Sequence, residues 1–152
     1  MFERRRFEGI IISHLGNIDG REPEQENTLT YIKKALAEGW HVCVDVLYRN
    51  GAFVLPSPRG FQPIPPALLS NQRVWARTFD AETIDGLCTV KAHCVIATNA
   101  PITLTSEQFI WTLPPTTLVD RSIAVFPEIA DPTWLGEYAP AGVCTNHPAQ
   151  YI

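Results

Sequence analysis

Side chains suited to acid–base or cation-binding chemistry follow the apolar strands predicted in the first third of the chain. The isoleucine run 10–12 is typical of a buried parallel strand and ends at His14. In the run 41–47 three valines alternate with His41, Cys43 and Asp45. One face of this strand is therefore expected to pack on helices, and the other to carry chemistry. An imidazole titrates near neutral pH and a carboxylate binds hard cations, so His14 and Asp45 are candidates for both roles.

The chain is expected to form parallel β/α units. Predicted strands lie at 73–76, 93–96, 109–113, 122–126 and 142–144, and predicted helices at 66–69 and 81–87, with a helix start at 103–107 and a short helix at 133–135. An earlier helix, capped by Asn27 or Thr28, is expected to end near Gly39. The carboxyl ends of parallel strands meet at one edge, so functional side chains should gather there. The candidates for this edge are His14, Asp45, Ser57, Arg77, Thr98, Asn99 and Glu128.

Short motifs in a fixed order connect this chain to a known family. They are His14-Leu15-Gly16, Glu26-Asn27-Thr28, Cys43-Val44-Asp45, Asn50-Gly51 and Ser57-Pro58. Their order and spacing resemble those of the glycerophosphodiester phosphodiesterases and their relatives among the phospholipase C-like phosphodiesterases. Leu104-Thr105-Ser106, Ile110-Trp111-Thr112 and residues 121–128 extend the resemblance to short bacterial and phage members, over nearly the whole chain.

The resemblance implies one domain, residues 1–152, with a compact, incomplete TIM-barrel-like α/β fold. A full barrel of that type needs about 250 residues, so 152 residues require shortened helices or loops in their place. Charged residues make up 18% of the chain and hydrophobic residues 45%, as in a globular protein.

The resemblance also implies which functional groups are kept and which are lost. Such enzymes use two histidines as acid and base, a Glu-x-Asp pair to hold a divalent cation, and Arg and Lys to hold phosphate. His14 and Asp45 match this pattern. The arginine, the metal-binding glutamate, the second histidine and the lysine are replaced by Leu15, Cys43, Ser57 and Phe79, and a His-Gln and acidic cluster by residues 97–101.

The losses predict a catalytically degenerate phosphodiesterase-like domain that binds or sequesters a phosphorylated small molecule, with nucleotides among the candidates. Each lost group is commonly worth about 10²-fold or more in rate. One alternative is a divergent active phosphodiesterase, in which His14 is catalytic and Asp45, Glu128 and Arg77 complete a reorganised site. A second alternative is a protein-interaction module without a ligand.

Each candidate ligand-binding residue also has a structural interpretation. His14 either contacts ligand or is bonded to Glu26 or the backbone, while Glu26 and Asn27 either touch ligand or organise the loop and the helix start. Arg77 and Arg59 either replace the lost phosphate-binding cations or are surface arginines. Ser57 has no evident base partner, which argues against a nucleophilic serine. Trp75 and Trp111 are expected to pack in the interior, with base or sugar stacking as the alternative.

No cofactor is expected for a binding domain. If the domain is active, Asp45 would help to hold Mg²⁺ or Ca²⁺, and a soft-metal site of Cys43, Asp45 and His14 is a further alternative. The four cysteines lack CxxC spacing and lie in or near apolar runs, so buried reduced thiols are expected at Cys43, Cys88, Cys94 and Cys144.

The net charge of −4 argues against electrostatic binding to nucleic acid or to an anionic membrane. The basic run Arg4 to Arg6 is expected to be solvated, with a phosphate or partner contact as the alternative. The sequence has no apolar run long enough to span a bilayer and no signal-peptide core, which predicts a cytoplasmic protein. The oligomeric state is not indicated.

Overall fold

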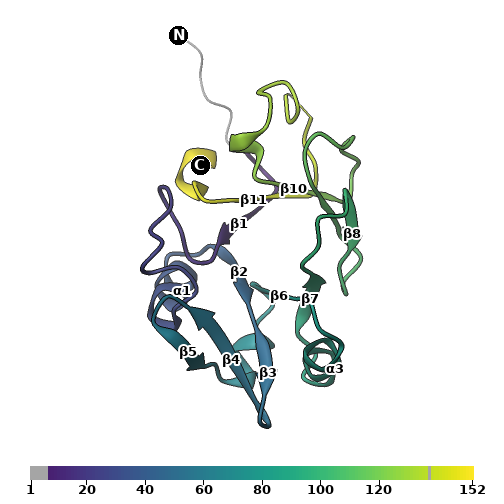
Figure 1. Ribbon diagram of the computed structural model, residues 1–152. Coiled ribbons are helices and arrows are strands. Elements are labelled where there is room, and N and C mark those ends of the chain that lie inside the picture. Colours follow the sequence, from purple (N-terminus) through teal and green to yellow (C-terminus); the bar gives the residue numbers. More distant parts are fainter. Residues whose placement is uncertain (1–6, 137) are drawn as a thin grey trace.

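One curved sheet of eight strands organises the molecule, in the order β7-β6-β2-β1-β11-β10-β9-β8 (Figure 1). The computed structural model describes residues 7–136 and 138–152, so the basic run Arg4 to Arg6 lies outside the described residues. Within this sheet β8 alone runs antiparallel to its neighbour, and the other seven strands are parallel. The strands are β1 (Ile10–His14), β2 (His41–Asp45), β6 (Val74–Thr78), β7 (His93–Ile96), β8 (Ile102–Leu104), β9 (Ile110–Thr112), β10 (Ser122–Val125) and β11 (Gly142–Thr145).

The two edges of the sheet approach each other, so the sheet forms a nearly closed barrel. The segment after β8 closes the seam: Ser106 donates its backbone N–H to the carbonyl of Cys94 at 2.9 Å, and the Cys94 N–H donates to Ser106 Oγ at 2.9 Å. His93 Nε2 lies 2.7 Å from Thr105 Oγ1 across the same seam. A loop thus supplies the contacts that a strand ladder would make in a closed sheet. The observed fold is a mixed α/β barrel-like sheet.

The barrel interior and the space under the helices form separate cores, and the alternation in β2 predicted the face that packs on helices. Val42, Val44 and Val46 face outward and pack with Ile32 of α1 and Leu87 of α3. The opposite face of the sheet fills the barrel with Ile12, Cys43, Trp75, Val95, Trp111, Ile123, Val125 and Cys144. Trp75 and Trp111 are therefore interior packing residues, with ring centroids 6.1 Å apart.

The described residues contain three short α-helices: α1 (Leu29–Ala37), α2 (Pro66–Leu69) and α3 (Ala81–Thr89). Thr28 caps α1 by accepting from the Tyr31 N–H, and Asp80 caps α3 by accepting from the Thr83 N–H. Of the two residues predicted to cap the first helix, Thr28 is the N-cap. No helix in the described part of the chain is long and apolar enough to cross a membrane.

A separate three-stranded sheet follows β2 and lies beside α1 (Figure 1). It comprises β3 (Leu47–Arg49), β4 (Ala52–Ser57) and β5 (Gly60–Pro63). The β3–β4 turn is the predicted Asn50-Gly51 turn, and both residues have positive φ, 53° and 78°. This sheet brings Pro56 close to the carboxyl end of β2.

The outer faces of β9, β10 and β11 are covered by loops and by two short 3₁₀ helices, η1 (Pro127–Ile129) and η2 (Pro148–Tyr151). Five outward side chains here are fully buried, and they are Thr112, Ser122, Ala124, Val143 and Thr145, whereas Ile110 at the start of β9 is half-buried. The two ends of the described chain meet at the outside of this region, where the Phe7 N–H donates to the carbonyl of Tyr151 at 3.1 Å.

Three sequence predictions are wrong. The helix start at 103–107 is instead strand β8 and a turn, because residues 102–104 pair with β9 and the Thr105 N–H bonds to Phe109 O. The helix at 133–135 is a turn held by Asp131, which accepts from the Thr133 N–H at 2.8 Å. Cys88 is exposed on α3, whereas Cys43, Cys94 and Cys144 are buried, and all four are free thiols.

Candidate functional site

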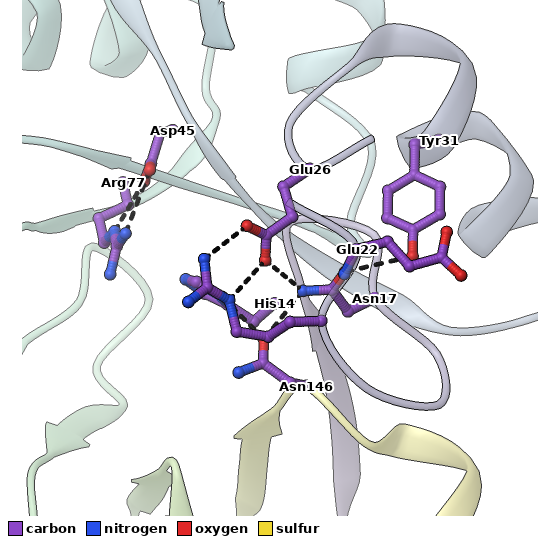
Figure 2. A network of polar contacts seen from close by, with 9 residues as sticks. His14, Asn17, Glu22, Glu26, Tyr31, Asp45, Arg77 and Asn146 are labelled. Atoms are coloured by element: carbon purple, nitrogen blue, oxygen red, sulfur yellow. Dashed lines mark hydrogen bonds and ion pairs between the residues drawn. The ribbon is translucent and has the colours of Figure 1, made fainter. Parts of the chain in front are cut away.

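Arg77 and Asp45 form a two-pronged ion pair at the carboxyl ends of neighbouring strands (Figure 2). They are register partners between β2 and β6, which places both side chains on the inner face. Arg77 Nε donates to Asp45 Oδ1 at 2.7 Å, and Nη2 donates to Oδ2 at 3.1 Å. Burial works against the charged guanidinium, but the bonds to Asp45 outweigh it and raise the pKa of Arg77. The guanidinium therefore remains charged.

His14 projects from the end of β1 and is neutral at pH 7. Burial, and then the charge of Arg77, lower the pKa of His14 to about 4 against the opposing influence of Asp45, Asn146 and Glu26. Its Nδ1 lies 3.1 Å from Asn146 Oδ1, and its ring meets Phe126 edge-on with centroids 4.8 Å apart. Asn146 Oδ1 accepts from Asn17 as well, which identifies it as the acceptor and His14 Nδ1 as the protonated nitrogen. Nε2 is buried and has no partner within residues 7–136 and 138–152.

A second group of polar residues in the loop after β1 is connected to His14 through Asn146, whose Oδ1 bonds both His14 and Asn17 (Figure 2). Asn17 Nδ2 donates to Glu26 Oε2 at 2.7 Å, and Arg21 holds the same carboxylate, with Nη2 2.9 Å from Oε1. The hydrogen bond from Arg21 is the main cause of the lowered pKa of Glu26. Tyr31 Oη donates to Asn17 Oδ1 at 3.2 Å. The bonds of Glu26 are those expected of the loop-organising interpretation.

Asn27 joins three segments through its side-chain amide. Its Oδ1 accepts from the Asp45 N–H at 2.9 Å, and its Nδ2 donates to the carbonyls of Asp45 and Pro56 at 2.9 and 2.7 Å. The backbone of Asn27 is left-handed, with φ 60°, a conformation that asparagine tolerates better than most residues. Asn27 therefore fixes the end of β2, where the Asp45 side chain begins.

Glu128 lies at the same rim and bonds to the residues at the end of β11. Its carboxylate accepts from Thr145 Oγ1 and from the Asn146 N–H, each at 3.0 Å. Glu128 therefore positions Asn146, which in turn orients the His14 ring.

Ser57 is not part of the cluster around Arg77. Its Oγ donates to the carbonyl of Gly60 at 2.9 Å and accepts from the Arg59 N–H at 3.2 Å, within the β4–β5 turn. Arg59 is exposed in the same turn. The structure thus places Arg77, rather than Arg59, next to Asp45 and His14.

Two cavities open beside Arg77 at the carboxyl ends of the strands. The smaller measures about 140 Å³ and is lined by Asp45, Val46, Leu47, Pro56, Arg77, Thr78, Phe79 and Ala97. The larger measures about 480 Å³ and is lined by Arg77, Ile96, Ala97, Thr98, Asn99, Trp111, Leu113, Val125 and Phe126. Arg77 and Ala97 border both, so the two cavities lie next to each other, and together they are called the mouth below. The predicted rim residues Thr98 and Asn99 lie in this mouth.

The donor set at the mouth fits a divalent cation poorly. Both carboxylate oxygens of Asp45 are already bonded to Arg77. Among the residues that the structure describes, no three His, Cys, Asp or Glu side chains are placed to hold a metal ion together. Cys43, the thiol of the soft-metal alternative with Asp45 and His14, is fully buried in the barrel interior.

Sequence reasoning missed Asn17, Phe126 and Asn146. Asn146 had a usable signal, because it comes two residues after Cys144 and so continues the inward face of the last predicted strand. Asn17 and Phe126 had none, since their partners are distant in sequence.

Comparison of the chain with protein-family models, with curated proteins and with solved structures finds no match. The arguments for function therefore rest on the geometry of the site.

Proposed function

We propose that this domain binds a phosphorylated small molecule at the mouth beside Arg77, without hydrolysing it. The observation that carries the proposal is a charged arginine, fixed by Asp45, that lines both cavities of the mouth. On this view the chain is a compact, incomplete TIM-barrel-like relative of the glycerophosphodiester phosphodiesterases that has lost catalysis.

Arg77 has donors left for a ligand. Asp45 engages Nε and one hydrogen of Nη2, and the guanidinium carries five N–H groups in all. Such a planar fork suits two oxygens of one phosphate. The ion pair with Asp45 fixes the Arg77 side chain, so that side chain loses little conformational freedom when a ligand binds.

The guanidinium also takes the position beside Asp45 that the resemblance assigns to a divalent cation. A metal ion and Arg77 would compete for the same two carboxylate oxygens. We therefore expect phosphate binding to be independent of Mg²⁺ and Ca²⁺, because the positive charge is supplied by the chain.

His14 favours binding over turnover. With a pKa of about 4, it is neutral at pH 7 and cannot serve as a general acid there. The second histidine of the resembled pattern is replaced by Ser57, whose hydroxyl is bonded within a turn.

The buried, unpartnered Nε2 of His14 supports a second candidate, a slow phosphodiesterase. In that reaction Nε2 would accept the proton of the attacking water as its oxygen bonds to phosphorus, and Arg77 would stabilise the phosphate charge. The ester P–O bond would break, and the departing alcohol would take up that proton. A module that only binds other proteins is the third possibility.

The test is calorimetric titration of the protein with inorganic phosphate, glycerol 3-phosphate, nucleoside monophosphates and a glycerophosphodiester, with Mg²⁺ or with EDTA. We expect binding of a phosphorylated compound that is unchanged by EDTA and lost in Arg77→Gln, and a ligand recovered intact by chromatography. Arg59→Gln is the matched control, because that arginine is exposed and lies in the β4–β5 turn.

Three results would contradict the proposal in different ways. If Arg77→Gln binds the phosphorylated compound as tightly as the unmodified protein does, Arg77 is not part of the binding site. Cleaved phosphodiester, with cleavage abolished by His14→Ala, would establish the slow enzyme. No binding of any phosphorylated compound would favour the protein-interaction module.

A further inference from the structure

We propose that Phe79 is a stacking platform for a nucleobase, so that the ligand of the mouth is a nucleotide; this inference rests on the proposed function. Phe79 comes two residues after Arg77, directly beyond the end of β6. Its side chain is 69% exposed, and it borders the same 140 Å³ cavity as Arg77 and Asp45. A charged group and an exposed aromatic ring thus face one space.

Exposure of an aromatic ring alone carries no inference, because single exposed apolar residues are common. Phe61 illustrates this point: it is 67% exposed on β5 and borders neither cavity of the mouth. Phe79 differs from Phe61 in its position beside the phosphate-binding cation. The two phenylalanines are therefore a matched pair, one inside the proposed site and one outside it.

The backbone around Phe79 is held on both sides. The preceding Thr78 accepts a hydrogen bond from the Ala97 N–H at 2.7 Å, and the following Asp80 caps α3, accepting from the Thr83 N–H at 2.8 Å. The ring consequently projects from a fixed segment, although its outer face is open to solvent. An aromatic ring presented in this way loses little freedom on contact with a ligand.

The separation of the two groups suits a nucleotide. Two residues of extended chain place the Cα atoms of Arg77 and Phe79 roughly 7 Å apart. A phosphate on Arg77 would leave the attached sugar inside the cavity and the base at its edge, next to the Phe79 ring. Leu47 and Pro56 also line this cavity and are apolar, which suits the faces of a planar base. A sugar phosphate without a base would gain nothing from Phe79.

The experiment compares adenosine 5′-monophosphate with ribose 5-phosphate, two ligands that share the phosphate and sugar but not the base. Calorimetric titrations are made on the unmodified protein, on Phe79→Ala and on Phe61→Ala. We expect tighter binding of the nucleotide than of the sugar phosphate. We also expect Phe79→Ala to weaken the nucleotide roughly 5- to 150-fold, since one stacked base is worth that much, and to leave ribose 5-phosphate unchanged. Phe61→Ala should alter neither affinity.

Phe79→Trp gives an independent readout. The indole should keep nucleotide affinity, and its fluorescence should change with adenosine 5′-monophosphate but not with ribose 5-phosphate. Far-ultraviolet circular dichroism of each variant checks that the fold is retained.

The failures are distinguishable. If both ligands bind the unmodified protein with equal affinity, or if Phe79→Ala weakens both equally, the stacking inference is overturned and the phosphate site stands. If neither ligand binds the unmodified protein, both the phosphate site and the stacking inference fall.

Discussion

The two sides of the barrel share a parallel sheet but are covered differently. On the side of β2, β6 and β7, helices α1 and α3 lie over outward valines such as Val42 and Val44. On the side of β9, β10 and β11, loops and 3₁₀ turns lie over Ser122, Ala124 and Thr145. Apart from Val143, the fully buried outward residues of the loop-covered side are threonine, serine and alanine, whereas three valines of β2 pack under the helices.

This difference shows how loops can cover a parallel sheet in place of helices. A loop has no internal ladder of hydrogen bonds, so its backbone groups need other partners. Here side chains provide them: Ser122 Oγ accepts from the Val119 N–H at 2.9 Å, and Thr145 Oγ1 accepts from the His147 N–H at 2.9 Å. Outward hydroxyl groups therefore satisfy backbone N–H groups on the loop-covered side, as the internal hydrogen bonds of the helices do on the other side.

Residues from both sides meet at the carboxyl ends of the strands. Asp45 and Arg77, which carry the charge, stand on the helix-covered side, while Asn146 and Phe126, which orient His14, stand on the loop-covered side.

The largest effect is expected from removing a side chain under a helix. Ile32→Ala empties a fully buried position between α1 and the sheet, and should lower the free energy of unfolding by about 2–5 kcal/mol. Urea denaturation measures the loss. The control Thr30→Ala, at an exposed position of the same helix, should change stability by less than about 0.5 kcal/mol. A loss below about 1 kcal/mol for Ile32→Ala would contradict the expectation that packing under the helices contributes more to stability than the loop-covered side does.

The seam between the two sides should make stability depend on pH. Burial lowers the pKa of His93 to about 4, and its Nδ1 faces Glu107 at 3.2 Å. The unfolded chain binds this proton near pH 6.5 and the folded chain only near pH 4. The contribution of His93 to the free energy of unfolding is therefore fully present above about pH 6.5. It is lost as the pH decreases toward 4, which lowers stability by roughly 3 kcal/mol.

Urea denaturation of the protein and of His93→Gln between pH 7.5 and 4.5 tests this expectation. The variant should lose less stability on acidification, with the remaining loss carried in part by His14, whose pKa is also about 4. Identical pH profiles for the two proteins would show that His93 is not the responsible group.

A smaller effect is expected on the loop-covered side. Ser122→Ala removes the acceptor of the Val119 N–H and a partner of Thr112 Oγ1, so it should cost about 1–2 kcal/mol. Thr117→Ala, at an exposed position of the same crossing loop, serves as the control. An unchanged unfolding midpoint in Ser122→Ala would argue that water serves this loop equally well.

The smallest effect concerns the start of a helix. Asp80→Ala deletes the N-cap of α3 and should cost about 1 kcal/mol. The Arg49–Asp80 ion pair is largely exposed and should add little to this value. Comparison with Arg49→Ala separates the two contributions, and an equal loss in both variants would assign the effect to the ion pair instead of the cap.

Local chemistry predicted much of the fold. Apolar runs identified most strands of the large sheet, and Thr28 and Gly39 marked the ends of the first helix. The seam was not predictable, because Ser106 and Cys94 meet only when the sheet closes. The Asp45–Arg77 pair was likewise hidden: each residue was a rim candidate, but strand register decides that they face each other. The misplaced helix at 103–107 reflects the same limit, since pairing with β9 overrides a local helix signal.

The meeting of Phe7 with Tyr151 has a consequence for how the chain can be rearranged. Because these segments are already bonded to each other, a short linker could join them without stretching the fold. New termini could then be opened at Asn50 and Gly51, an exposed turn at the far end of the β3–β4 hairpin. Such a circular permutant would start within the small sheet, and the barrel strands would keep their order around the ring.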